Sequence, residues 1–140
     1  MSDRPQLIGI VLCELVLQDV LRRDAISCVN IHSGVVAPAF PTQLPLIYAF
    51  AQLTGGKIGF QYQFKVLDPD GNLLGSSPMA QVDPLPNENI THKIINAFTG
   101  LTFDREGVYG FALDVDGETV GTLPFQVVQA TPQQMQQQQA

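Results

Sequence analysis

The sequence predicts an all-β protein that folds as a single antiparallel β-sandwich of about seven to eight strands. Several segments alternate apolar and polar residues with the period of two that a half-buried strand requires. Turn-forming clusters of Gly, Pro, Asp and Asn separate these segments, and almost no window holds apolar residues at helical spacing. The length of 140 residues fits one domain with its own core. The same pattern also fits a partly closed barrel.

Four of the expected strands are weakly marked. They cover Ile8 to Leu17, Ala25 to Ser33, Met79 to Val82 and Glu88 to Ala97. The last of these segments also fits a short helix, but it is rich in β-branched residues such as Ile94 and Ile95, which favour a strand.

The most regular strand runs from Ile58 to Asp68. Its apolar residues fall on one face and are Phe60, Tyr62, Phe64 and Val66. Gly55-Gly56-Lys57 before it and Asp68-Pro69-Asp70-Gly71 after it are turn sequences. We expect Leu46 to Leu53 and Asn72 to Gly75 to pair with this strand across those turns, as a three-stranded antiparallel unit.

A second hairpin is expected at the C-terminal end of the domain. Tyr109 to Val115 alternates in the same way, and Asp116-Gly117 after it is typical of a two-residue type I′ turn. Glu118 to Val128 forms the return strand, and Pro124 has no N–H for a ladder, so this strand should be an edge or carry a bulge there. The predicted core consists of Phe60, Tyr62, Phe64, Tyr109, Phe111, Leu113, Leu123 and Phe125.

The two ends of the chain differ from this pattern. Residues 1–6 are expected to be a loose N-terminus, and residues 7–128 the β-sandwich domain. Residues 129–140 are rich in Gln and lack apolar residues at regular spacing. This predicts a disordered tail, because such a segment cannot offset its ordering entropy. The composition also permits a Gln-rich self-association segment.

Composition argues against several classes of function. Seven Lys and Arg against 13 Asp and Glu give a formal charge of −6. Nucleic-acid binding takes clustered cations, so we expect no nucleic-acid partner. The first apolar run, Leu7 to Leu17, contains Glu14 and is shorter than the roughly 20 residues that cross a bilayer. It also lacks the cleavage site of a signal peptide, so we expect a cytoplasmic protein without a membrane partner.

Motifs for catalysis, cofactor binding and metal binding are missing from the sequence. Asp68, Asp70 and Asn72 have the first spacings of a calcium loop, but its sixth position lacks Gly and its twelfth lacks Glu. Gly55-Gly56-Lys57 lacks the flanking residues of a phosphate loop. Zinc-ligand spacing is missing among Cys13, Cys28, His32 and His92. We expect a non-enzymatic protein with no cofactor, no bound metal and two reduced cysteines.

One segment resembles immunoglobulin-like domains. The run Asp104-Arg105-Glu106-Gly107-Val108-Tyr109 is similar to the start of the strand that carries their tyrosine corner. The resemblance implies an immunoglobulin-like sandwich in which the Tyr109 hydroxyl bonds to backbone just upstream. Phe111 stands in place of the second core cysteine, and the sequence has no Trp, so the implied relative lacks the inter-sheet disulfide.

A larger part of the chain, from about Leu7 to Val128, resembles a family of small uncharacterised bacterial all-β proteins, a domain of unknown function. The similar features are Cys13-Glu14, Phe40-Pro41 before Leu46-Ile47-Tyr48, Leu67-Asp68-Pro69-Asp70-Gly71, Gly107-Val108-Tyr109-Gly110-Phe111, Asp116-Gly117-Glu118 and Pro124-Phe125. This resemblance implies the all-β fold and brings no activity with it.

The segment with the strongest indication of function runs from Gly34 to Pro45. Its apolar, Pro-rich sequence is poorly suited to a strand interior. One reading is a loop that crosses between the sheets with Phe40 in the core. The other is an exposed interaction loop, since an apolar surface patch marks contact sites. The residues of that loop would be Val35, Val36, Pro38, Phe40 and Pro41.

These observations predict a non-enzymatic protein-interaction or scaffold module that binds an unknown protein partner or itself. Its low charged fraction of 14% and at least one edge strand favour such contacts. The alternative is a small-ligand or carbohydrate-binding β-sandwich, which should show a concave pocket with convergent polar groups.

Overall fold

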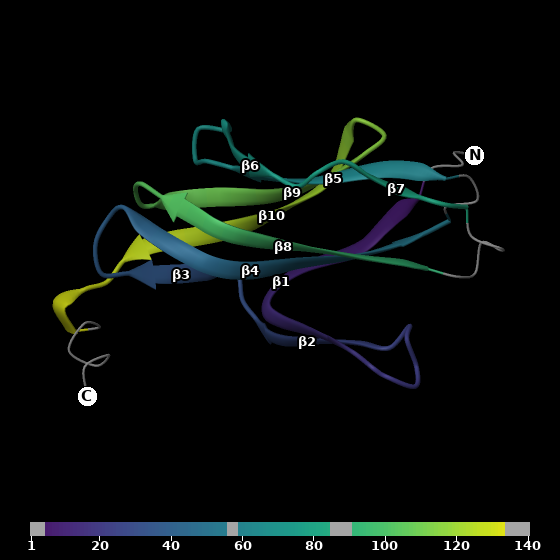
Figure 1. Ribbon diagram of the computed structural model, residues 1–140. Coiled ribbons are helices and arrows are strands. Elements are labelled where there is room, and N and C mark those ends of the chain that lie inside the picture. The colour runs from purple at the N-terminus through teal and green to yellow at the C-terminus, as the bar shows by residue number, and fades with distance from the viewer. Residues whose placement is uncertain (1–4, 56–58, 85–90, 134–140) are drawn as a thin grey trace.

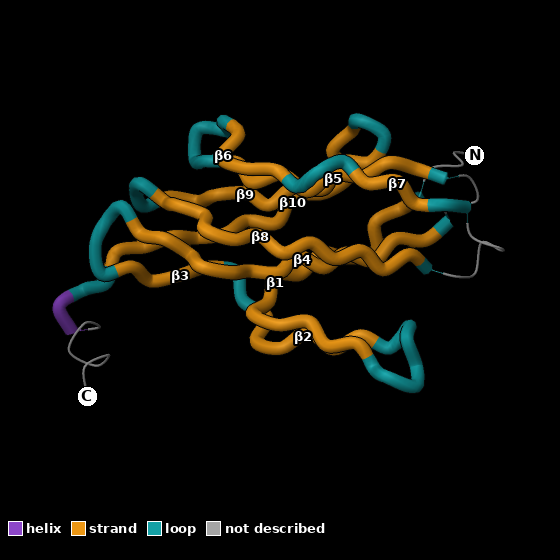
Figure 2. Tube along the Cα trace, viewed as in Figure 1, coloured by secondary structure: helices purple, strands orange, loops and turns teal. Residues whose placement is uncertain are grey.

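The described part of the chain is built from strands in two layers. A computed structural model describes residues 5–55, 59–84 and 91–133. Figures 1 and 2 show the two layers packed face to face. In these ranges, no helix has the length and apolar character that a bilayer crossing takes. The strands are β1 (Gln6–Gln18), β2 (Ile26–Ile31), β3 (Gly34–Ala37), β4 (Thr42–Thr54), β5 (Phe60–Leu67), β6 (Leu73–Ser76), β7 (Ala80–Val82), β8 (His92–Phe103), β9 (Gly107–Val115) and β10 (Glu118–Gln129).

Each layer is one sheet. The first sheet has the strand order β2-β1-β4-β8, and the second has the order β3-β10-β9-β5-β6, with β7 paired to β5. The predicted all-β, sandwich-like fold is confirmed, with ten strands in the described residues rather than seven or eight. One pairing departs from the antiparallel prediction, because β3 runs parallel to β10.

One predicted pairing is wrong. Leu46 to Leu53 was expected beside Ile58 to Asp68, but β4 pairs with β1 and β8 in the first sheet, whereas β5 pairs with β9 in the second. Both strands alternate because each turns one face to the core between the sheets. The chain crosses from one sheet to the other between Thr54 and Phe60. Of the predicted Gly55-Gly56-Lys57 turn, residues 56–57 lie outside the described residues.

The core lies between the two sheets and draws on both. In the second sheet, the predicted core residues Phe60, Phe64, Tyr109, Phe111, Leu113 and Phe125 are buried, and Tyr62 and Leu123 are partly buried against them. The first sheet supplies Leu12, Ile47, Ala49, Ala51, Leu53, Ile94, Phe98, Leu101 and Phe103. Aromatic rings join the sheets, since the Phe103 ring centroid lies 4.8 Å from that of Tyr109 and 5.8 Å from that of Phe125.

The residues of β8 that face the core change from even-numbered to odd-numbered positions partway along the strand. Ile94 and Phe98 are buried before Gly100, and Leu101 and Phe103 are buried after it. Gly100 has a φ of +66°, in the left-handed region that favours glycine. This change returns Phe103 to the core. β8 ends at Phe103, beyond its predicted end at Ala97, and residues 88–90 of the predicted strand lie outside the described residues.

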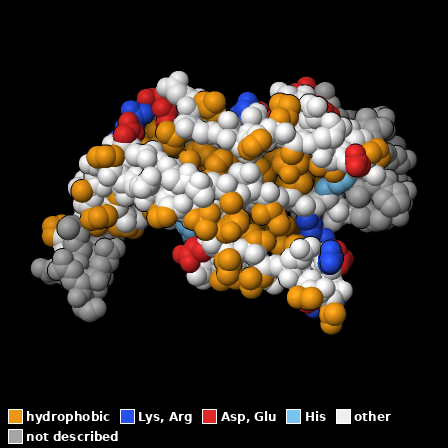
Figure 3. Space-filling model, in the orientation of Figure 1, with side chains coloured by type: hydrophobic (Ala, Val, Ile, Leu, Met, Phe, Trp, Pro, Cys, Tyr) orange, Lys and Arg blue, Asp and Glu red, His pale blue; other side chains and the backbone are white. Residues whose placement is uncertain are grey.

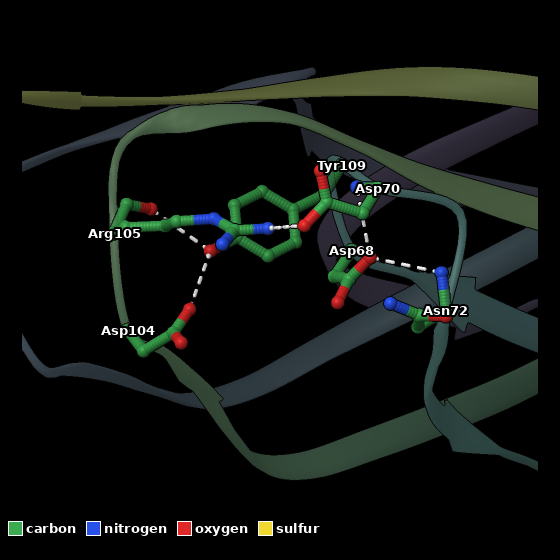
Figure 4. A network of polar contacts seen from close by, with 6 residues as sticks. All are labelled: Asp68, Asp70, Asn72, Asp104, Arg105 and Tyr109. Carbon is green, nitrogen blue, oxygen red and sulfur yellow. Dashed lines mark hydrogen bonds and ion pairs between the residues drawn. The ribbon is translucent and has the colours of Figure 1, made fainter.

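A polar network ties two turns together, as Figure 4 shows. The Asp68 carboxylate accepts hydrogen bonds of 2.9 Å from the backbone N–H groups of Asn72 and Asp70, and the bond from Asn72 contributes most to lowering the pKa of Asp68. Arg105, in the turn before β9, forms a 2.6 Å ion pair with Asp70. The Tyr109 hydroxyl donates to the Arg105 carbonyl at 2.8 Å, which confirms the predicted backbone bond. The immunoglobulin-like resemblance itself stays a prediction.

The predicted C-terminal hairpin is confirmed. β9 and β10 pair antiparallel from Val115 with Glu118 to Gly107 with Val127. Asp116 and Gly117 both have positive φ, at +50° and +83°, as a type I′ turn requires.

Pro124 lies on a stretch of β10 that β3 does not reach. β3 pairs with residues 126–129 of β10, and the Gln126 N–H donates to the Ser33 carbonyl on that side. Pro124, two residues earlier, turns its nitrogen to the same side of the strand. Its missing N–H therefore interrupts no bond to β9. The stretch around Pro124 is an edge, as predicted, although β10 as a whole lies between β3 and β9. The irregularity in β10 lies between Thr119 and Gly121.

The ends of the fold differ slightly from the predicted boundaries. β1 begins at Gln6, and residues 1–4 lie outside the described residues. β10 continues through Gln129, and the Ala130 N–H donates to the Ala37 carbonyl at 2.7 Å. The first two residues of the predicted tail therefore belong to the folded domain. Residues 134–140 of that tail lie outside the described residues.

An ion pair lies on the outer face of the second sheet. The Lys65 ammonium is 2.7 Å from the buried Asp114 carboxylate, which also accepts a 2.6 Å hydrogen bond from the Thr119 hydroxyl. Burial by itself would raise the pKa of Asp114. The hydrogen bonds and charge of Lys65 and Thr119 outweigh burial and hold this pKa below its ordinary value of 3.8.

Lys65→Met should therefore destabilise the fold in a pH-dependent way. At neutral pH we expect a loss of about 1–2 kcal/mol, because a buried carboxylate loses its cation. A lowered folded-state pKa contributes stability above the unfolded-state pKa, and this stability is lost as the pH falls through the folded-state value. The difference between wild type and variant should thus shrink as the pH falls below the ordinary Asp value of 3.8. Urea unfolding at neutral pH and at a pH well below 3.8 measures it.

The matched control for this prediction is Lys65→Met in an Asp114→Asn background. With the carboxylate gone, removing the ammonium should change the free energy of unfolding little at either pH. An equal loss in both backgrounds would mean that Lys65 stabilises the sheet through its aliphatic stem rather than through the ion pair.

Candidate functional site

The β1–β2 hairpin leaves the body of the sandwich. β1 pairs with β4 as far as Cys13, opposite Tyr48, and from Leu15 to Gln18 it pairs with β2 alone. Figure 1 shows this hairpin projecting from the layers beneath β4. We call residues 14–31 the hairpin arm.

The arm bends where it leaves the sheet. Asn30 has a φ of +56°, which is rare for a residue with a side chain. Its Nδ2 donates a 2.9 Å hydrogen bond to the Glu14 Oε2 on the opposite strand. Asn tolerates the left-handed region better than most residues because its short polar side chain can bond locally. The bend turns the arm back over the outer face of β4 and β8.

Cross-strand pairing sets the two faces of the arm, because residues paired across two strands share a face. Val16 pairs with Cys28 and Gln18 pairs with Ile26 on the inner face, which lies toward the sandwich. Leu15 pairs with Val29 and Leu17 pairs with Ser27 on the outer face. The exposed large hydrophobic residues of the arm are Leu15, Leu17, Val20, Leu21 and Ile31.

A hydrogen-bonded loop presents the tip of the arm. The Asp19 carboxylate accepts hydrogen bonds of 2.8 Å from the backbone N–H groups of Leu21 and Arg22. Both bonds lower the pKa of Asp19, and the bond from Arg22 contributes most. Two backbone hydrogen bonds close the loop. The Asp19 N–H donates to the Ala25 carbonyl, and the Ala25 N–H donates to the Arg22 carbonyl. Val20 and Leu21 are 88% and 93% exposed at its end, and apolar side chains lie along the arm in Figure 3. A fixed loop thus holds two aliphatic side chains in solvent.

The two cysteines lie together at the base of the arm. Cys13 is buried in the first sheet, and Cys28 belongs to the inner face of the arm folded over it. Burial, and then the neighbouring Cys28 thiol, raise the pKa of the Cys13 thiol to about 11. Both cysteines are free thiols, and Cys13 stays protonated at neutral pH.

The predicted interaction loop is in part a strand, which corrects the sequence prediction. Val35 and Val36 belong to β3, and Val35 packs against the core while Val36 is exposed. Phe40 packs partly buried against the core, as the loop-crossing interpretation requires. Pro38 and Pro41 are exposed, and the peptide bond before Pro41 is cis. The segment links the second sheet to the first, with Val35 and Phe40 against the core and Val36, Pro38 and Pro41 in solvent.

The histidines and acidic turns form no metal cluster within the described ranges. His32 lies against Phe125 with 5.9 Å between ring centroids, and His92 lies against Phe60 at 4.9 Å. The residues of the calcium-like Asp68 turn are engaged in the network of Figure 4. The sequence offered Cys13, Cys28, His32 and His92 as possible metal ligands. Of these four, the structure brings Cys13 and Cys28 together.

The sequence does carry a signal for the arm. Val20 and Leu21 stand in a turn between charged residues, where a loop rarely needs two large aliphatic side chains. Glu14 interrupts the apolar run of β1 at the level of the bend. Neither feature shows from sequence alone that β1 leaves the sheet there.

Comparison with known proteins gives a family and no curated relative. Residues 9–128 match a family model described as a family of unknown function (DUF6941). No curated protein matches the chain.

Proposed function

The chain belongs to the DUF6941 family of unknown function, and from that premise we propose that it is a non-enzymatic interaction module that self-associates through its hairpin arm. The exposure of Val20 and Leu21 on a hydrogen-bonded loop carries this proposal. Ordered apolar side chains in water are unfavourable unless a partner covers them. The outer-face residues Leu15 and Leu17 continue this apolar surface along the arm.

The occupant we propose is the arm of a second copy. β2 is the end strand of the first sheet, and an edge strand offers unpaired backbone groups to another strand. Antiparallel pairing of β2 with its copy places the tip of each arm beside the base of the other. Val20 and Leu21 then meet Ile31 of the second copy, which is 60% exposed. One two-fold axis relates all these contacts, as in an isologous dimer.

The distribution of charge also favours contact between the arms of two copies. The arm carries three acids, Glu14, Asp19 and Asp24, and two arginines, Arg22 and Arg23, so its formal charge is −3 + 2 = −1. The rest of the chain carries −6 + 1 = −5. Two copies therefore repel each other less through their arms than through their remaining surface.

We do not place the contact at Val35 to Pro41. β3 is also an end strand, but it has only four residues, and its Val35 and the following Phe40 pack against the core. The arm has both an unpaired strand edge and an uncovered apolar face, which is the combination that strand addition requires.

The test is the oligomeric state of the full chain, by native mass spectrometry and light scattering over a range of protein concentrations. We expect a dimer for the wild type. Val20→Ser combined with Leu21→Ser, and separately Leu17→Lys, should each weaken the dimer about 100-fold, since buried apolar anchors dominate interface energy.

The control variant is Leu73→Ser, which removes a similarly exposed leucine from β6, away from the arm. It should leave the dimer constant unchanged. A wild-type monomer at every concentration, or equal weakening by Leu73→Ser, would contradict self-association through the arm.

A further inference from the structure

The inner face of the arm encloses a pocket against the outer face of the first sheet. The pocket has a volume of about 470 Å³, within the range of small-molecule sites in proteins. The arm lines it with Val16, Gln18, Arg23, Asp24 and Ile26, and the sheet lines it with Tyr48, Thr91, Lys93 and Ile95.

The walls of the pocket combine apolar and polar groups. Val16 and Ile26 supply apolar groups from the arm, and Tyr48 of β4 and Ile95 of β8 supply them from the sheet. The Thr91 hydroxyl oxygen accepts a 3.0 Å hydrogen bond from Gln52 Nε2, so its hydrogen remains able to donate. A ligand here can bury an apolar body and still meet hydrogen-bonding groups.

The two cations of the pocket, Arg23 and Lys93, differ from the other cations of the described residues. Arg22, Lys65 and Arg105 each pair with an aspartate, at 3.3, 2.7 and 2.6 Å respectively. Among the residues that the structure describes, no ion pair involves Arg23 or Lys93. Both line the pocket, one from the arm and one from the sheet.

The local charge is opposite to that of the chain. Arg23 and Lys93 against Asp24 give the lining a formal charge of 2 − 1 = +1, in a protein of charge −6. In Figure 3 the Lys and Arg side chains beside the arm lie against apolar ones. One cation comes from the arm and one from the sheet, and apolar side chains line the rest of the cavity. This combination suits a ligand that has an anionic group attached to an apolar part.

We propose that this pocket binds a small organic carboxylate with an aliphatic or aromatic body. Arg23 and Lys93 hold the carboxylate, and Val16, Ile26, Tyr48 and Ile95 cover its apolar part. Because the lining is divided between arm and sheet, a bound carboxylate holds the arm against the sandwich.

The experiment titrates the full chain with hexanoate and benzoate and follows the backbone amides of Val16, Ile26 and Lys93 by NMR. The uncharged probes 1-hexanol and benzyl alcohol match the apolar bodies, and inorganic phosphate is an anion without one. We expect the two carboxylates to shift these amides, and to bind about tenfold or more tightly than the alcohols and phosphate. Amide exchange along the arm should also slow when a carboxylate is bound.

Charge variants identify the groups responsible. Lys93→Gln and Arg23→Gln should each weaken carboxylate binding about tenfold and leave alcohol binding unchanged. Arg22→Gln is the matched control, because it removes the same charge from the same loop while Arg22 pairs with Asp19 and does not line the pocket. It should change binding less than about twofold. All three arginine and lysine side chains are exposed, so the variants should fold, which thermal unfolding confirms.

The proposal is overturned if the alcohols bind as tightly as the carboxylates, if Arg22→Gln weakens binding as much as Lys93→Gln, or if saturating carboxylate leaves the three amides unshifted. Failure here is separate from failure of the proposed dimer. Leu17 lies on the outer face of the arm, so Leu17→Lys should weaken self-association about 100-fold while the pocket still binds carboxylate.

Discussion

Replacing Phe125 with alanine should lower the free energy of unfolding by about 4 kcal/mol. Phe125 is fully buried on β10. Its ring is stacked on Phe103 of the opposite sheet, meets Phe111 of the neighbouring strand edge-to-face at 5.3 Å, and contacts His32. Alanine removes all three ring contacts and leaves a cavity at the junction of the two sheets, where the surrounding strands cannot collapse freely.

Guanidinium or urea unfolding measures this loss, with the denaturant slope showing whether the transition stays cooperative. Phe125→Leu keeps most of the volume and should cost about 1–2 kcal/mol. Val108→Ala truncates a largely exposed side chain on the adjacent strand and should change stability by less than about 0.5 kcal/mol. If Phe125→Ala costs no more than Val108→Ala, the aromatic cluster does not hold the sheets together.

Gly34→Ala should destabilise the fold by about 2–4 kcal/mol, although it adds a single methyl group. A Cβ at this position would lie 2.5 Å from the carbonyl oxygen of Gln126. That oxygen belongs to the backbone of β10, which is itself held by β9, so it cannot move away without breaking the pairing of β3 with β10. The expected loss is therefore concentrated in β3 and the last residues of β10.

Gly9→Ala is the matched control, since an added Cβ there meets no atom within 4 Å. It should be neutral or stabilise the protein slightly, because alanine reduces the conformational freedom of the unfolded chain. Urea unfolding measures both variants, and hydrogen exchange at Val127 and Val128 localises the effect. Equal stabilities of the two variants would contradict the close approach of β3 to β10.

Local features of the fold were predictable from the sequence because short segments determine them. Asp116-Gly117 supplies the positive φ of a two-residue turn wherever the hairpin lies. Asp68 caps its turn with backbone bonds from residues two and four positions ahead. The alternation of β5 and β9 identifies their buried faces because the period of two is a property of each strand alone.

The pairing of strands and the candidate site depend on distant residues, and this is where prediction from the sequence fails. Alternation shows that β4 buries one face, but not that it joins β1 and β8 rather than β5. Phe103 was missed as a core residue because Gly100 shifts the alternation just before it. The pocket is formed only when the bend at Asn30 brings the arm over Lys93 and Tyr48, which follow it by tens of residues.

The parallel pairing of β3 with β10 also constrains how the protein is made. Gly34 pairs with Gln126, a separation of 126 − 34 = 92 positions. Contacts between residues so far apart form slowly, because the intervening chain must be closed into a loop first. During synthesis, which runs from the N-terminus, β3 has to wait for nearly the whole domain to leave the ribosome. A nascent chain that stalls before residue 126 keeps that edge open to neighbouring chains, so we expect this protein to depend on chaperones while it is being translated.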